Sequence, residues 1–302
     1  MSDPDQQAAV RDQIVVGHDG SDGGRDALAL AVALADAWGQ DPTITVVGVY
    51  PYDPSYKSAS DTYEAKLAEQ TEGQLTDARA LYSDRANVRF TVVRGSSPAQ
   101  ALHNVARDLD ARAIVVGRSH TNVVTRPFLG SATEQALHGS PCAVVVAPVG
   151  WADRGAQLQT IGVAYDGGEN ARHAAEVAGR LAAHSGAALR ILRVVQTVPL
   201  WYGGALDPFP LDALRADAEE DIAALRGQLG EIDVTGEIIL GDTRTALEDP
   251  AGIDLLVVGS RGFGAVRRVV LGSTSTQLVR HAKVPVVVVP RIGEDEGSGP
   301  RD

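Results

Sequence analysis

The residues with the clearest chemical potential form a glycine loop in the second half of the chain. Gly259 and Gly262 follow an apolar, valine-rich run, and Gly272 and Ser273 then open a segment with helical periodicity. Glycines let a backbone approach a ligand closely, and the N–H groups at a helix start, together with the helix dipole, hold phosphate. Ser273 and Ser275 add hydroxyl donors there. The spacing therefore predicts a phosphate site where a strand passes into a helix.

Two aspartates accompany loops of this kind. Asp19 and Asp166 each end the first apolar run of one half of the chain. A carboxylate at that place accepts hydrogen bonds from vicinal sugar hydroxyls but repels phosphate, which suits the ribose end of a nucleotide. The alternative is an aspartate that caps a helix or holds a turn. Its presence in both halves, each time with a glycine loop, favours the ligand site.

These positions recur because the chain contains one unit twice. IVVGHDG at 14–20 returns as IGVAYDG at 161–167, and IVVG at 114–117 returns as LVVG at 256–259. A length of 302 residues agrees with two domains of about 150 residues each. We expect a first domain at 11–149, a linker at 150–158, a second domain at 159–291, and flexible tails at 1–10 and 292–302.

Short apolar runs alternate with amphipathic helical patterns in both copies. The first copy predicts strands at 13–17, 43–50, 88–94, 113–117 and 142–147, and helices at about 22–38, 58–85, 98–109 and 131–139. This alternation indicates an α/β fold with parallel strands and helices on both faces of the sheet. In the second copy we expect the third helix to be about one turn long, because Pro250 follows soon after Thr243. Doubly wound folds bind ligands at the carboxyl ends of their strands.

Composition excludes several classes of protein. A net charge of −12 argues against a nonspecific nucleic-acid binder. Cys142 is the single cysteine, so there is no disulfide framework, and its valine neighbours predict a core strand residue. The sequence has neither an apolar run of about 18 residues nor a signal-peptide pattern at its start, so we expect a cytoplasmic protein with no membrane contact.

Several catalytic patterns are missing. The sequence has no Gly-x4-Gly-Lys-Ser/Thr motif of a P-loop ATPase and no Gly-x-Gly-x-x-Gly after its first strand. Its seven histidines show no spacing typical of a zinc site or a catalytic triad. An enzyme that hydrolyses ATP needs a group that positions the attacking water, and no such residue is identifiable. We therefore assign no catalytic residue and no metal ligand.

Together these segments resemble the universal stress protein family, in its tandem form with two domains in one chain. The resemblance covers about 14–148 and 160–290, and its strongest element is the signature Gly259, Gly262, Gly272 and Ser273. It implies two Rossmann-like (HUP-type) domains, each with five parallel strands in the order 3-2-1-4-5. Family members that carry the signature bind ATP, whereas a second class lacks the signature and does not bind it.

The resemblance also implies a set of contacts in each copy. In the second copy it implies that Asp166 binds the ribose, that the backbone of Val194 contacts the adenine, and that Val258 and Gly259 line the pocket. The residues implied around the phosphates are Gly262, Gly272, Ser273, Thr274 and Ser275. The matching positions in the first copy are Asp19, Val49, Val116, Gly117, Gly130, Ser131, Ala132 and Thr133. His120 stands where the second glycine of the first loop belongs. It either obstructs phosphate, donates a ring N–H to phosphate, or has no effect; we expect the second copy to be the better site.

Two further features concern charge and assembly. Arginines are frequent in both loops, where they either offset the negative field around a phosphate site or serve as solubilising charge. They are Arg118, Arg126, Arg261, Arg267 and Arg268. The valine runs at 144–146 and 286–289 would be hazardous as open sheet edges. We expect them to pair in an intramolecular pseudo-dimer, as the family resemblance also implies, and homodimerisation is left open.

The leading functional hypothesis is a nucleotide-dependent stress-response regulator that holds ATP, with Mg²⁺, as a ligand whose occupancy biases conformation or partner contacts. One alternative is an enzyme that hydrolyses ATP slowly or transfers phosphate. The other is a dimerisation scaffold with vestigial nucleotide sites.

Overall fold

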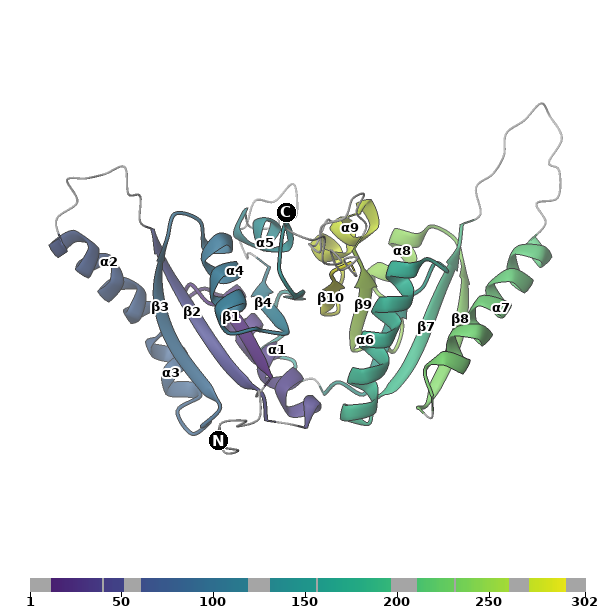
Figure 1. Ribbon diagram of the computed structural model, residues 1–302, viewed down its shortest axis with the longest axis horizontal. Coiled ribbons are helices and arrows are strands. Elements are labelled where there is room, and N and C mark those ends of the chain that lie inside the picture. The colour runs from purple at the N-terminus through teal and green to yellow at the C-terminus, as the bar shows by residue number, and fades with distance from the viewer. Residues whose placement is uncertain are drawn as a thin grey trace, which may run out of the picture.

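The computed structural model describes residues 12–39, 41–51, 61–118, 131–155, 157–196, 211–230, 232–260 and 272–291 (Figure 1). The first half of the chain forms β1 (Gln13–Gly17), α1 (Asp22–Trp38), β2 (Thr43–Pro51), α2 (Asp61–Gln74), α3 (Thr76–Leu81), β3 (Val88–Gly95), α4 (Pro98–Asp108), β4 (Ala113–Gly117), α5 (Ser131–Leu137) and β5 (Ala143–Ala147). The second half forms β6 (Thr160–Ala164), α6 (Glu169–Ser185), β7 (Ala188–Val195), α7 (Leu211–Gln228), β8 (Val234–Leu240), α8 (Thr243–Glu248), β9 (Leu255–Gly259), α9 (Ser273–His281) and β10 (Val286–Val289).

The strands form one sheet in the order β3-β2-β1-β4-β5-β10-β9-β6-β7-β8. Within each half the neighbouring strands are parallel and follow the order 3-2-1-4-5, which confirms the expected α/β fold. The halves meet where β5 and β10 pair in antiparallel fashion, with Val145 opposite Val287. The two half-sheets therefore lie side by side, with their outer strands at opposite ends of the molecule (Figure 1).

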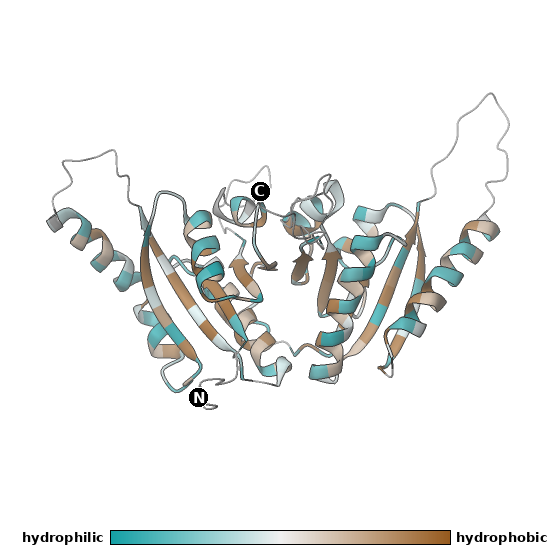
Figure 2. Cartoon of the chain, viewed as in Figure 1, coloured by the Kyte–Doolittle hydropathy of each residue, from teal (hydrophilic) through white to brown (hydrophobic). Residues whose placement is uncertain are grey.

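Alternation along the valine runs divides the core between the two faces of the sheet. Val144 and Val146 pack in one apolar cluster with residues of α4, α5 and α9, whereas Val145 packs in the other with residues of α1 and α6. A strand covered by helices on both faces is apolar at every position, because each side chain is buried whichever way it points. The hydropathy colouring shows this contrast between apolar strands and helices of mixed character (Figure 2). None of the helices in the part of the chain described is long and apolar enough to cross a membrane.

The long helix expected at 58–85 is divided into α2 and α3, which corrects that prediction. Leu75 lies between them, fully buried, and its N–H bonds to Glu72 O at 3.1 Å in a tighter turn. The hydroxyls of Thr71 and Thr76 donate to carbonyls four residues earlier, Leu67 O and Glu72 O. Such bonds locally disturb helices, and the residue between α2 and α3, Leu75, lies in the core.

The helix expected to be short, α8, has six residues. It begins at the Asp242 N-cap, whose Oδ1 accepts from Arg244 N and Thr245 N, and it ends just before Pro250. The residue before a proline is disfavoured in helical conformation, so the sequence itself stops this helix. Its counterpart in the first half, α4, has 11 residues and starts instead with Pro98.

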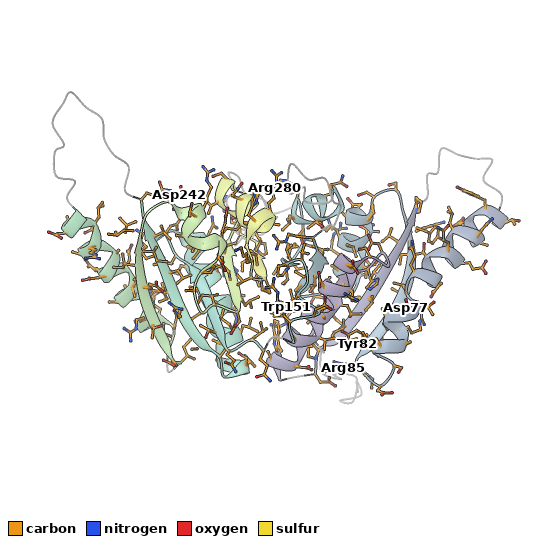
Figure 3. All side chains as sticks on the ribbon, turned by 180° about the vertical axis from the view of Figure 1, so that it is seen from behind. Asp77, Tyr82, Arg85, Trp151, Asp242 and Arg280 are labelled. Atoms are coloured by element: carbon orange, nitrogen blue, oxygen red, sulfur yellow. The ribbon has the colours of Figure 1, made fainter. Side chains whose placement is uncertain are left out.

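The segment between the halves is packed against the first half. Trp151 is 5% exposed, and the Asp26 carboxylate of α1 accepts hydrogen bonds from Gly150 N and Ala152 N, both at 2.8 Å. Figure 3 places Trp151 at the junction of the two halves. The start of the expected linker, although polar and aperiodic in sequence, is therefore held to the first half by the buried Trp151 side chain and by the Asp26 carboxylate.

Cys142 lies one residue before β5, half-buried, and packs against the cluster that holds Val144. Burial raises the pKa of its thiol to about 12. A thiol in this state is inert as a nucleophile at neutral pH, which agrees with a packing role.

Candidate functional site

The second half contains a cavity at the carboxyl ends of β6, β7 and β9, bounded by the starts of α6, α8 and α9. β6 and β9 are neighbours in the sheet, and the chain leaves them in opposite directions, so the cavity lies at the switch point of the fold. Its volume of about 560 Å³ suits a small-molecule ligand. Seven of the residues expected at a nucleotide site line it: Asp166, Val194, Val258, Gly259, Ser273, Thr274 and Ser275.

One wall of the cavity is the start of α9. Gly272 is the N-cap, in extended conformation, and has no side chain to cap the helix. The first N–H groups of a helix lack intrahelical acceptors, so those at Ser273 and Thr274 are available beside the cavity. Ser275 is buried and its Oγ donates to Gly259 O at 3.2 Å, which ties α9 to the end of β9. The end of β9, the start of α9 and the hydroxyl-bearing residues Ser273, Thr274 and Ser275 therefore line one cavity.

Asp166 also lines the cavity; it is exposed and lies two residues after the end of β6. Its Oδ1 accepts a hydrogen bond from Gly168 N at 2.9 Å across a turn in which Gly167 has a φ of +84°. The carboxylate thus holds the turn as well as lining the cavity. The ligand and turn interpretations of Asp166 are compatible, because the turn keeps the carboxylate at the cavity mouth.

Gly259 and its counterpart Gly117 are required by helix packing. A Cβ on Gly259 would lie 2.7 Å from Asn170 O, and one on Gly117 would lie 1.8 Å from Gly23 O. The first turns of α6 and α1 therefore pass directly over these glycines. Sequence reasoning attributed the glycines to close approach by a ligand, whereas the contact in the structure is with the protein's own backbone.

The first half repeats much of this scaffold. Asp19 Oδ1 accepts from Ser21 N at 3.1 Å, and Ser21 Oγ in turn accepts from Gly24 N at the start of α1. Thr133 is buried, and its Oγ1 donates to Gly117 O at 2.9 Å, as Ser275 does to Gly259. The other predicted positions at this edge of the sheet are Val49 near the end of β2 and Val116 near the end of β4.

Some predicted residues lie outside the part of the chain that the structure describes. These are Gly130 and Gly262, His120, and the loop residues Arg126, Arg261, Arg267 and Arg268. Ser131 and Ala132 are placed only by their backbone, at the start of α5. Arg118 is described, and its Nη1 donates to Arg280 O of α9 at 2.9 Å, so its charge lies at the contact between the halves.

His18 is a residue whose role the sequence did not reveal. It is 7% exposed, and its Nδ1 accepts a hydrogen bond from Gly20 N at 3.0 Å, which identifies a neutral ring with its proton on Nε2. Burial lowers the pKa of His18, although the charge of Asp19 acts in the opposite direction. Tyr165, also buried, occupies the equivalent position in the second half. Through its hydrogen bond with Gly20 N, the His18 ring supports the turn that carries Asp19.

The rim beside β7 and α8 also contains residues that sequence reasoning missed. Gln196 Nε2 donates to Thr243 Oγ1 at 3.0 Å, and both residues line the cavity with Arg244. Their signal was their position: they follow a strand and begin a helix at the same edge of the sheet as Asp166. Across the described ranges, no group of three or more histidine, cysteine or acidic side chains has the arrangement of a metal site.

The chain is similar in sequence to known proteins over most of its length. A sequence profile described as "Universal stress protein family" matches residues 11–148 and 157–290. A universal stress protein of Mycobacterium tuberculosis is 27% identical over 290 residues, covering 92% of this chain and 99% of its own length. One from Thermus aquaticus is 35% identical over 138 residues, covering 44% of this chain and 98% of its own.

A crystal structure of a universal stress protein from Archaeoglobus fulgidus has the same fold. Its TM-score is 0.65 at 23% sequence identity, and the match covers 92% of this chain and 97% of that one. The family profile matches both halves of the sequence, and each half has the strand order expected of the family. The chain therefore belongs to the universal stress protein family and carries two of its domains in tandem.

Proposed function

We propose that the second domain binds ATP and that its occupancy regulates the conformation or the partner contacts of this protein. The observation that carries the proposal is that one cavity of about 560 Å³ joins the Asp166 carboxylate to the uncapped start of α9. A nucleoside triphosphate has the complementary pair of ends, with sugar hydroxyls as donors and phosphates as acceptors.

The lining suggests an orientation for the nucleotide. Ribose hydroxyls donate to Asp166, and the phosphates accept from the N–H groups at the start of α9 and from the Ser273 hydroxyl. The base lies against the apolar side chains Leu192 and Val194, which are on the same cavity wall. Asp166 and Glu169 place two carboxylates in the same cavity as the phosphates, so we expect Mg²⁺ to accompany ATP and reduce the electrostatic repulsion.

The way the domains join supports a regulatory role. β5 and β10 pair through their valines, and we propose that the domains at 11–149 and 159–291 act as an intramolecular pseudo-dimer. A ligand regulates only if its affinity differs between two states. We infer that the two states differ in the contact between the domains, because α9 contributes both to the cavity and to that contact.

Equilibrium dialysis with Mg²⁺-ATP tests the site. Ser273→Glu places a carboxylate at the phosphate end, and the variant should fold because negative charge at a helix start is stabilising. We expect its ATP affinity to fall by at least about tenfold, from repulsion between like charges at short distance. Ser273→Gln has nearly the same size as the glutamate without its charge and serves as the matched control. Unchanged ATP binding by Ser273→Glu would contradict the proposal.

Two further substitutions test which domain holds the better site. Gly262→Ala should weaken the tighter binding event, whereas His120→Gly should strengthen the weaker one or leave it unchanged. Native mass spectrometry counts the nucleotides bound by each variant. If the spectrum at millimolar ATP shows no bound nucleotide, both sites are vestigial and the scaffold hypothesis is favoured.

A further inference from the structure

The first domain makes a direct contact with the helix at the phosphate end of the cavity in the second domain. Arg118 follows β4 immediately, and its Nη1 donates to Arg280 O at 2.9 Å. Arg280 is the penultimate residue of α9 and is labelled in Figure 3. The last four carbonyls of a helix lack intrahelical donors, so Arg118 supplies a charged donor to one of them.

As a result α9 is held at both ends. At its start, Ser275 Oγ donates to Gly259 O at the end of β9 at 3.2 Å. At its end, the donor is Arg118 of the other domain. A helix of nine residues is about 13 Å long. Because α9 is short, hydrogen bonds near its two ends fix the orientation of the helix and therefore the direction of its first N–H groups.

Arg118 is itself held firmly. Its N–H donates to Ala147 O at 3.2 Å, and its carbonyl packs so closely on α1 that a Cβ on Gly23 would lie 2.5 Å from it. Burial lowers the pKa of Arg118 to about 10, with a smaller contribution from Arg154, while the charge of Asp26 raises it. The guanidinium therefore stays protonated at neutral pH and acts as a fixed donor.

The two domains differ at the position of Arg118. Ser260 occupies the position in the second domain that Arg118 occupies in the first, and it is 1% exposed. Its Oγ is buried and makes no hydrogen bond within the described ranges. The first domain therefore contributes a cation to α9 from this position, whereas the second domain has a neutral serine at the equivalent position. Arg118 thus acts on the domain whose cavity is lined by the start of α9.

We propose that Arg118, a residue of the first domain, is a positioning residue for the nucleoside triphosphate site of the second domain, acting through the carboxyl end of α9. The inference rests on the proposed function, because it concerns the same cavity. In consequence the second site is complete only when both domains are docked, and ATP binding there strengthens the docking in return.

Hydrogen exchange of the full-length protein is measured with and without Mg²⁺-ATP. Residues 273–281 of α9 report on the second site, and residues 131–137 of α5 report on the first. Three variants are compared with wild type by exchange and by calorimetry. Arg118→Met removes the donor, Arg118→Lys keeps a cation, and Arg154→Met is the matched control. Arg154 Nη1 donates to Lys283 O, so it also joins the domains but contacts the chain beyond α9.

We expect Arg118→Met to raise exchange at 273–281 without ATP and to weaken ATP binding there by about fivefold, within the usual range of coupling between sites. Arg118→Lys should restore most of the affinity, and Arg154→Met should leave it within about twofold of wild type. If Arg118→Met fails to fold, Arg118→Gln, which removes the charge and shortens the side chain, replaces it, and an ATP affinity of Arg118→Gln within about twofold of wild type overturns the proposal. If ATP protects residues 273–281 of Arg118→Met from exchange as strongly as in wild type, the role of Arg118 is refuted. The proposal that the second domain binds ATP is not affected by that result. Absence of ATP protection at 273–281 in wild type would instead overturn the proposed function.

Discussion

Asp26 of α1 accepts a hydrogen bond from Gly150 N at 2.8 Å and so ties the first domain to the segment that leads into the second. The same carboxylate also accepts from Ala152 N, and Asp26 is 2% exposed. A buried carboxylate that accepts from two backbone N–H groups is a strong anchor, because hydrogen bonds to charged groups contribute more than neutral ones. The segment that joins the domains is consequently held in a defined position against α1.

Replacing this anchor should destabilise the protein. Asp26→Asn puts an amide NH₂ against one backbone donor, and we expect a loss of about 1–3 kcal/mol in the free energy of unfolding. Urea unfolding followed by tryptophan fluorescence measures the loss, with buried Trp151 as a nearby reporter. The control is Asp36→Asn, which removes an exposed ion pair with Arg85 and should cost less than about 1 kcal/mol. Equal losses in the two variants would contradict the assignment.

A second prediction concerns the glycines that end β4 and β9. Gly117→Ala forces a methyl group to 1.8 Å from Gly23 O, and Gly259→Ala brings one to 2.7 Å from Asn170 O. Overpacking of this kind costs about 1–3 kcal/mol or more, and we expect the larger loss of stability at position 117. Gly227→Ala in α7, where a Cβ meets nothing within 4 Å, should instead stabilise the protein. Thermal unfolding of the three variants tests the order.

A third prediction concerns pH. Burial lowers the pKa of His18, so the unfolded chain binds a proton at this histidine more readily than the folded one. The stability that neutral His18 contributes is therefore fully present above its unfolded pKa of about 6.5 and is lost as the pH falls below that value. His18→Tyr, which copies the residue at position 165, should reduce this loss. Urea midpoints at pH 7.5 and pH 5.5 measure the difference, and an identical drop in both proteins would refute the prediction.

The single thiol offers a fourth prediction. With a pKa of about 12, Cys142 has on the order of 10³-fold less thiolate at pH 8 than an unperturbed cysteine. We expect slow labelling by a thiol-reactive disulfide reagent in the native protein and rapid labelling in urea. Because no other cysteine is present, the native rate reports opening around the start of β5. Fast labelling of the native protein would show that this region is not packed as described.

Much of the fold could be predicted from local sequence patterns. The repeat of IVVGHDG as IGVAYDG gave the tandem organisation, and the apolar runs gave strands whose bounds in the structure differ by one residue at most in the first half. The short α8 followed from Pro250, since a proline acts on the residue just before it. The division of α2 from α3 was missed, because the burial of Leu75 depends on packing and not on helical periodicity.

Of the candidate site, sequence alone determined which residues stand at the ends of strands, and hence that Asp166, Gly259 and Ser273 would meet at one edge of the sheet. Only the tertiary structure decided what lies against them. Gly259 faces the backbone of α6, and Arg118 bonds to a carbonyl 162 positions away in the other domain. Periodicity and turn residues act between neighbours in sequence, whereas these contacts arise when distant segments pack, and no local pattern specifies their partner.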